Sequence, residues 1–288
     1  MLYFHGFLLI SLLVTGLLPV VAVADVQRTK FSIEGAYLVL EVLDDDLIHF
    51  ELSAIGSGPA EDAPLYTSPM VLKADYAGPS TFDRHGNVIE TKDLQVTVDE
   101  QTLCVEVRDK TRENAKLTKF CGAYLPQARK GLDIDRAGIN QVYGLGQQFR
   151  KLGSADNDWL AHGMREGQAD LGNGFQGFQS AAVGNVQIPV YYALGDGGLN
   201  YAVLLDNVYD QQWNFATSPW QVRMFGDQLR WYVMTGTDLA DLRADYMELT
   251  GTPPVPPRKA FGLWVSEFGY RNFGDFVSFV EQEVAKKG

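Results

Sequence analysis

Two pairs of aspartates have the residue type and the short spacing that acid and base chemistry uses. Asp133 and Asp135 form one pair, and Asp156 and Asp158 form the other. A carboxylic acid can donate a proton while a second carboxylate attacks or activates water. Acidic pairs near turns, however, more often accept hydrogen bonds from the backbone and face solvent. We therefore assign no catalytic role to either pair.

Metal and cofactor chemistry have little support in the sequence. The four histidines are scattered, at positions 5, 49, 85 and 162, and the two cysteines do not have the spacing of zinc ligands. The GLG motif at 144–146 lacks the third glycine and the following helix of a dinucleotide site. We expect no metal and no cofactor.

The elements that would position any site are mostly short strands. Alternating or β-branched runs, separated by Gly, Asp, Asn and Pro, fill residues 31–234, which is typical of a β-sandwich. Clear examples are residues 37–42, 47–52, 94–98, 188–194 and 201–205. A stretch of about 200 residues can bury a two-sheet core, so we expect one sizeable domain.

The C-terminal part changes character. Residues 229–234 are rich in β-formers, and a helix is predicted at 238–249, with Leu239, Leu242, Tyr246 and Leu249 on one face and Gly251 after its end. The proline-rich segment 252–259 then forms a stiff linker. Residues 260–266 predict a buried strand, and the apolar spacing from Phe273 to Val284 predicts another helix.

This region resembles glycoside hydrolase family 31, the group of retaining α-glucosidases and α-xylosidases. The resemblance rests on YVMTG (232–236), YMELTG (246–251), PPR (256–258) and GLW (262–264) followed by Gly269 and Tyr270. Upstream, VYGLGQ (142–147) and YAVLLDN (201–207) also look like motifs of that family's β-sandwich, so the resemblance covers roughly residues 30–288.

The resemblance implies a mainly β chain. We expect an antiparallel, galactose mutarotase-like β-sandwich at 25–251, the linker at 252–259, and the first βα unit of a truncated (β/α)8 barrel at 260–288. A lone βα unit leaves strand edges and apolar surfaces uncovered, so the chain reads as a fragment. The family's two catalytic aspartates lie on later barrel strands, so we expect no catalytic residue and little activity in this stretch alone.

The resemblance also suggests residues that line the sugar pocket. Tyr270 matches the tyrosine that follows the first barrel strand. The long segment 151–184 occupies the place of a loop that reaches over the pocket, and its candidates for sugar contact are Asp158, Trp159, Glu166 and Asp170. Aromatic faces can stack on sugars and carboxylates can accept hydrogen bonds from hydroxyl groups. Turn capping and local packing are the alternatives for these residues.

The N-terminal segment 1–24 predicts export. It carries no acidic or basic side chain, and Ala22-Val23-Ala24 has the small-x-small pattern of a signal-peptidase site. An uncleaved membrane anchor is the alternative, and contact with a membrane is expected only in that case. The net charge of −12 argues against nucleic acid as a partner, and the family's oligosaccharides or α-glycosides are the expected ligands.

Cys104 and Cys121 flank a polar turn at 109–114. If residues 103–108 and 115–121 form a hairpin, the two cysteines stand almost opposite each other. A cross-strand disulfide and two buried thiols both remain open.

A second class of function competes with the glycosidase. The sandwich alone could be a non-catalytic carbohydrate-binding or surface module, which the missing catalytic aspartates favour and the expected barrel strand disfavours. The family also includes lyases and transglycosylases, so the type of reaction stays open.

Overall fold

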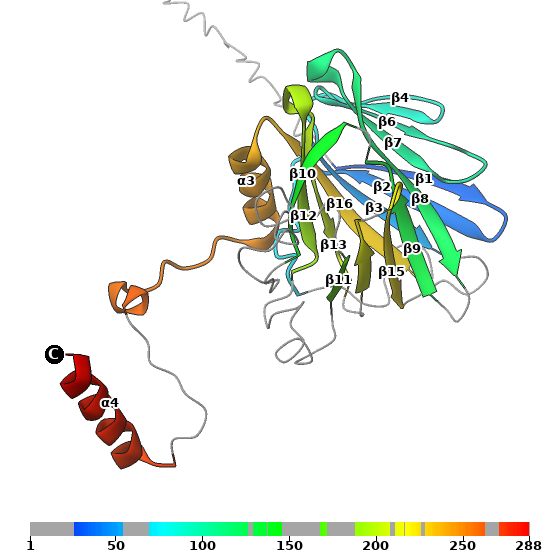
Figure 1. Ribbon diagram of the computed structural model, residues 1–288. Helices are drawn as coiled ribbons and strands as arrows, with labels where there is room; N and C mark the ends of the chain where they lie inside the picture. Colours follow the sequence, from blue (N-terminus) through cyan, green and yellow to red (C-terminus); the bar gives the residue numbers. More distant parts are fainter. Residues whose placement is uncertain are drawn as a thin grey trace, which may run out of the picture. The chain divides into compact units, whose positions relative to one another are not determined.

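The computed structural model describes residues 26–53, 69–125, 129–136, 138–145, 168–171, 188–207, 211–215, 217–225, 228–262 and 271–287. Contacts divide the chain into two units, 1–251 and 252–288, and each is described here by itself. The larger unit consists of two antiparallel sheets (Figure 1).

The first sheet has seven strands in the described part of the chain, and β16 lies at its centre. In spatial order they are β1 (Gln27–Ile33), β2 (Ala36–Val42), β3 (Leu47–Ser53), β16 (Gln228–Gly236), β13 (Asn200–Leu205), β12 (Val190–Gly195) and β10 (Ile139–Gly144). Trp231 on β16 pairs with Phe50 on β3 and with Leu205 on β13. Strands from the two ends of the domain therefore meet in the middle of this sheet.

The second sheet has nine strands among the described residues. Their order is β11 (Gln168–Leu171), β14 (Gln211–Asn214), β15 (Trp220–Phe225), β9 (Arg129–Ile134), β8 (Ala115–Leu125), β7 (Val105–Asp109), β6 (Leu94–Val98), β5 (Val88–Glu90) and β4 (Asp83–His85). Most of these strands are joined by short turns. The connection between β7 and β8 contains the 3-10 turn η1 (Lys110–Arg112). Another 3-10 turn, η4 (Asp196–Gly198), joins β12 to β13.

The core lies between the two sheets because most of the strands turn alternate apolar side chains inward. In β6 and β7 every second residue is buried, from Leu94 to Val98 and from Val105 to Asp109. Trp213, Trp220 and Trp231 are all at most 2% exposed in this layer. This architecture confirms the predicted two-sheet, mainly β fold.

The outer face of the seven-stranded sheet is partly covered by α3 (Leu239–Thr250), which packs on β16, β13 and β12 (Figure 1). Asp238 caps the helix by accepting hydrogen bonds from the backbone N–H groups of Ala240 and Asp241. Leu242 and Leu249 are fully buried, whereas Leu239 is 40% exposed. The predicted helix is present, but its apolar face is narrower than the sequence spacing indicated.

The smaller unit contains η5 (Arg258–Phe261) and α4 (Phe273–Lys287). The strand predicted at 260–266 is wrong at its start, because Ala260 and Phe261 belong to this 3-10 turn, and residues 263–270 lie outside the described part. A parallel strand requires neighbours for its hydrogen bonds. Residues 252–262 and 271–287 contain no strand that could supply these hydrogen bonds. The predicted barrel start thus remains an expectation.

None of the helices in the described part of the chain is long and apolar enough to cross a membrane. The predicted signal segment, residues 1–24, lies outside the described residues.

Candidate functional site

Most of the sugar-contact candidates lie outside the described residues. Asp158, Trp159, Glu166 and Tyr270 lie outside the described residues. Of Asp170 only the backbone is described, in β11, where it pairs with Gln212 on β14. The roles suggested for all five candidates therefore remain predictions.

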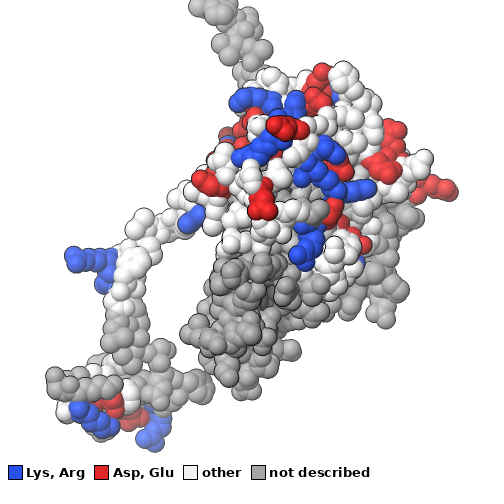
Figure 2. Space-filling view, turned by 45° about the horizontal axis from the view of Figure 1, so that its top comes forward, with Lys and Arg blue, Asp and Glu red and all other residues white. Residues whose placement is uncertain are grey.

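Of the first acidic pair, Asp133 and Asp135 bind cations on the outer face of the nine-stranded sheet. Asp133 accepts a hydrogen bond from Nη2 of Arg223 at 2.6 Å, and Asp135 accepts one from Nζ of Lys116 at 2.5 Å. Lysine and arginine side chains also lie beside aspartates and glutamates on the visible face of the sandwich in Figure 2. In the structure these two carboxylates are ion-pair partners of Arg223 and Lys116. Asp156 and Asp158 lie outside the described residues.

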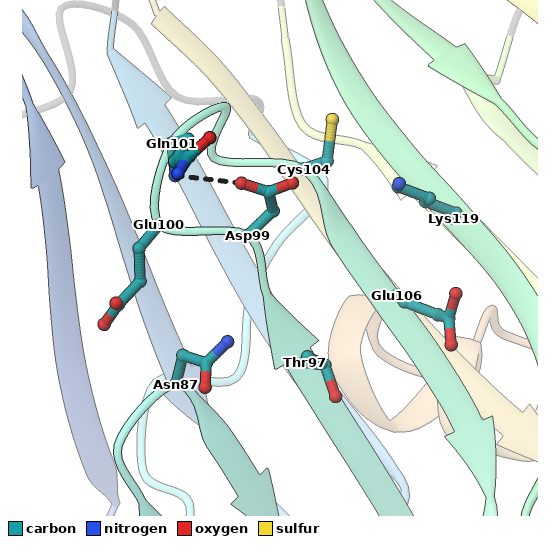
Figure 3. A pocket seen from close by; sticks show the side chains of 8 residues that line it. All are labelled: Asn87, Thr97, Asp99, Glu100, Gln101, Cys104, Glu106 and Lys119. Carbon is teal, nitrogen blue, oxygen red and sulfur yellow. Dashed lines mark hydrogen bonds between the residues drawn. The ribbon is translucent and has the colours of Figure 1, made fainter.

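A pocket of about 580 Å³ opens on this same outer face, beside the turn at 99–104 (Figure 3). Thr97 on β6, Glu106 on β7 and Lys119 on β8 lie side by side across three paired strands. The complete lining is Asn87, Thr97, Asp99, Glu100, Gln101, Cys104, Glu106 and Lys119. The lining has no aromatic side chain and is rich in hydrogen-bonding groups.

Cys104 and Cys121 are joined by a disulfide at the edge of this pocket. Cys104 directly precedes β7 and Cys121 lies on β8, beside the paired residues Val105 and Phe120. The cysteines are therefore opposite one another, and the bond ties the turn at 99–104 to β8. Of the two alternatives that the sequence left open, the structure contains the disulfide.

A buried charged cluster, which sequence reasoning missed, lies on the outer face of the seven-stranded sheet. His49 is 2% exposed, and its Nδ1 is 2.6 Å from a carboxylate oxygen of Glu41. This hydrogen bond holds the pKa of Glu41 below its usual value. Arg230 lies 3.7 Å from Glu51 and 3.4 Å from Asp206.

Polar residues at outward positions of three strands were the signal available in the sequence: Glu41 on β2, His49 and Glu51 on β3, and Arg230 on β16. Burial raises the pKa of Glu51 despite the nearby Arg230. His49 also stacks on Tyr232, with ring centroids 4.5 Å apart. The ion pairs offset part of the cost of removing these charges from water. The arrangement is suited to fixing strand register.

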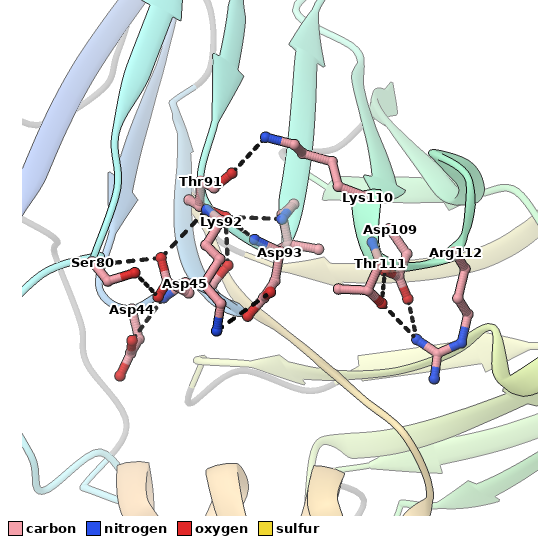
Figure 4. A network of polar contacts seen from close by, with 11 residues as sticks. Asp44, Asp45, Ser80, Thr91, Lys92, Asp93, Asp109, Lys110, Thr111 and Arg112 are labelled. Atoms are coloured by element: carbon pink, nitrogen blue, oxygen red, sulfur yellow. Dashed lines mark hydrogen bonds and ion pairs between the residues drawn. The ribbon is translucent and has the colours of Figure 1, made fainter.

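An acidic cluster surrounds the turn between β2 and β3 (Figure 4). Asp45 accepts hydrogen bonds from the backbone N–H and the hydroxyl of Ser80, and its own carbonyl accepts one from the Thr91 hydroxyl. Burial, followed by the nearby Asp44 carboxylate, raises the pKa of Asp46 to about 6. Burial and several carboxylates raise the pKa of Asp245 on α3 to about 7. No group of three or more potential ligands in the described residues could hold a metal ion.

Comparison with known proteins gives related glycosidases. No family model matches the chain. Intestinal sucrase-isomaltase of Suncus murinus is 28% identical over 145 residues, which is 50% of this chain and 8% of that protein. Alpha-glucosidase 2 of Bacillus thermoamyloliquefaciens is 29% identical over 100 residues, which is 33% of this chain and 13% of that protein. The matched segment therefore spans only a small part of each relative.

Solved structures share the fold over most of the chain. A GH31 α-xylosidase from a soil metagenome, complexed with xylose, has a TM-score of 0.66 at 13% identity and covers 91% of this chain and 39% of its own. A GH31 dextranase of Flavobacterium johnsoniae, complexed with glucose, has a TM-score of 0.63 at 17% identity and covers 83% of this chain and 29% of its own.

The mainly β fold, with two antiparallel sheets and few helices, is consistent with the N-terminal domain of these enzymes. The chain is thus similar to glycosidases of glycoside hydrolase family 31, in sequence over about half its length and in fold over most of it.

Proposed function

We propose that this chain is the N-terminal part of an exported retaining α-glycosidase of the family 31 type. Residues 1–24 act as the signal peptide, residues 25–251 form the supporting sandwich, and residues 260–288 begin the catalytic barrel. The substrate is an α-linked glucoside or xyloside. The observation that carries the proposal is the agreement between the sequence relatives, which are sucrase-isomaltases and an α-glucosidase, and the structural neighbours, which include an α-xylosidase and a dextranase.

The chemistry of this reaction requires two carboxyl groups about 5–5.5 Å apart in a retaining enzyme. Three aspartates of the sandwich already have structural partners, because Asp133 and Asp135 bind cations and Asp45 stabilises a turn. This supports a sandwich that does not supply the catalytic carboxyl groups. The sandwich then contributes support and the walls of the substrate entrance. The nucleophile and the acid/base belong to the barrel, and the chain by itself is close to inactive.

The sugar pocket in this proposal is lined by Tyr270 and by side chains of the segment 151–184. Asp158, Trp159, Glu166 and Asp170 are its candidates. Tyr270 would contact the sugar that is cleaved, since residues at the C-terminal ends of barrel strands face the active site. The segment 151–184 would contact the next sugar along.

The test compares this 288-residue chain with a longer protein that includes a complete barrel. Both are assayed with 4-nitrophenyl α-glucoside and α-xyloside, and the anomeric product is followed by NMR. We expect the longer protein to release an α-sugar first and the chain alone to release none. Absence of hydrolysis by the longer protein, combined with oligosaccharide binding by the chain alone, would favour the carbohydrate-binding module instead.

A further inference from the structure

The turn pocket, defined by the eight side chains drawn in Figure 3, is an ordered site although it lies at the surface. The turn at 99–104 is closed by two backbone hydrogen bonds between Asp99 and the residues Leu103 and Cys104, of 2.7 and 2.8 Å. The Asp99 carboxylate accepts the N–H groups of Gln101 and Thr102 at 2.8 and 3.1 Å. The disulfide then fastens Cys104 to β8. One wall of the pocket is thus fixed before any ligand arrives.

The polar groups of the pocket fall into two sets. Some are already bound within the protein: Nδ2 of Asn87 donates to the carbonyl of Val98 at 2.8 Å, and Glu106 accepts a hydrogen bond from Arg108 at 2.7 Å. The Thr97 hydroxyl, the Gln101 carboxamide and the Lys119 ammonium have no side-chain hydrogen bond or ion pair with any residue in the described ranges. The fixed set shapes the pocket, and the second set is available to a ligand.

The charges and the lining exclude several ligand classes. Three carboxylates, those of Asp99, Glu100 and Glu106, face one ammonium, that of Lys119, so the pocket repels phosphates and other anions. The carboxylates of Asp99 and Glu106 already accept hydrogen bonds from Gln101 and Arg108. No cluster of three or more potential metal ligands occurs in the described part of the chain. No aromatic or purely aliphatic side chain lines the pocket, so it does not suit a ligand that must bury a large apolar surface.

A neutral ligand with many hydroxyl groups remains. Its hydroxyls can donate to Glu100 and accept from Lys119, while Thr97 and Gln101 can do both. The volume of about 580 Å³ falls within the usual range for small-molecule sites. We infer that the turn pocket binds a neutral saccharide at the surface of the sandwich. This inference does not depend on hydrolysis by the longer protein.

The test uses the full chain and a neutral trisaccharide, maltotriose, in an NMR titration. Thr97→Val and Lys119→Met each remove one ligand-directed group and leave the core intact, because both side chains point outward from the sheet. Gln221→Ala, on the outer face of β15 and outside the pocket lining, is the matched control. We expect saturable binding that is weakened about three- to tenfold by each pocket variant and is unchanged in the control.

Three results would overturn the inference. These are no saturable binding at about 10 mM maltotriose, binding that neither pocket variant weakens, and tighter binding of a trisaccharide that carries a uronic acid, which would contradict the charge argument. Hydrolysis of 4-nitrophenyl glycosides by the longer protein carrying Lys119→Met is measured separately. Loss of binding without loss of hydrolysis would separate this site from the proposed catalytic function.

Discussion

Replacing Asp245 by Asn should stabilise the sandwich, and the gain should depend on pH. Asp245 lies on α3 with a half-buried carboxyl, whose Oδ2 has no hydrogen-bond partner among the described residues. Burial is the largest cause of its raised pKa of about 7, and the carboxylates of Asp46, Asp241 and Glu248 add to it. The charged form is therefore disfavoured in the folded chain.

The sign follows from linkage. Because the folded pKa lies above the unfolded value of 3.8, the neutral carboxyl stabilises the fold fully below that value, and this contribution is lost as the pH rises to about 7. The increase of the pKa from 3.8 to about 7 corresponds to about 4 kcal/mol. Screening by solvent at a half-buried site reduces the expected effect to about 1–2 kcal/mol.

Asp245→Asn removes the charge and nearly keeps the shape. Above pH 7 we expect it to raise the free energy of unfolding by about 1–2 kcal/mol, or the melting temperature by about 2–8 °C. Below the unfolded pKa the variant and the natural chain should have nearly equal stability. Urea denaturation followed by tryptophan fluorescence, between pH 3.5 and 8, measures the difference. Asp75→Asn, at an exposed position, is the control.

A stability difference that is the same at every pH would refute this reasoning, because it would show that the substitution acts through packing and not through charge. A destabilising effect at pH 8 would refute it as well, since the amide would then have lost a favourable interaction of the carboxylate.

Three further perturbations test the packing. Leu242→Ala removes a fully buried side chain between α3 and the sheet, so urea denaturation should show a loss of about 2–5 kcal/mol, against a few tenths for the exposed Leu239→Ala. The double variant Cys104→Ser and Cys121→Ser should lower the free energy of unfolding by about 2–3 kcal/mol, and reduction of the natural chain should produce the same loss. Gly144→Ala should destabilise the sandwich by more than about 1 kcal/mol. The added Cβ would lie 2.2 Å from the backbone oxygen of Val190, and the φ angle of Gly144 is +127°. An unchanged melting curve would contradict that geometry.

The β-strands were predictable where alternation was strong. Residues 94–98 are a strand in both the prediction and the structure, with alternate residues buried. The strand predicted from 188 begins only at Val190, because Pro189 has no N–H to donate to the ladder. The helix at the end of the sandwich was also predictable, since Asp238 supplies its cap and Gly251 follows its last residue.

The candidate sites were harder to predict from the sequence. The turn pocket brings Asn87, Thr97 and Lys119 together from three separate segments, and no local motif links them. The pKa of Asp245 is raised by burial and then by Asp46, which lies about 200 positions earlier in the chain. Such properties arise from neighbours that are distant in sequence, so periodicity and turn chemistry do not reveal them.

The sequence by itself determined the local elements of this protein and its resemblance to family 31, because side-chain periodicity, capping residues and short motifs act over a few neighbouring residues. The tertiary structure decided that β16 lies between β3 and β13, that Cys104 and Cys121 are joined, and which charged groups are buried. These features depend on long-range strand pairing and packing. They exist only once distant segments have closed into the two sheets.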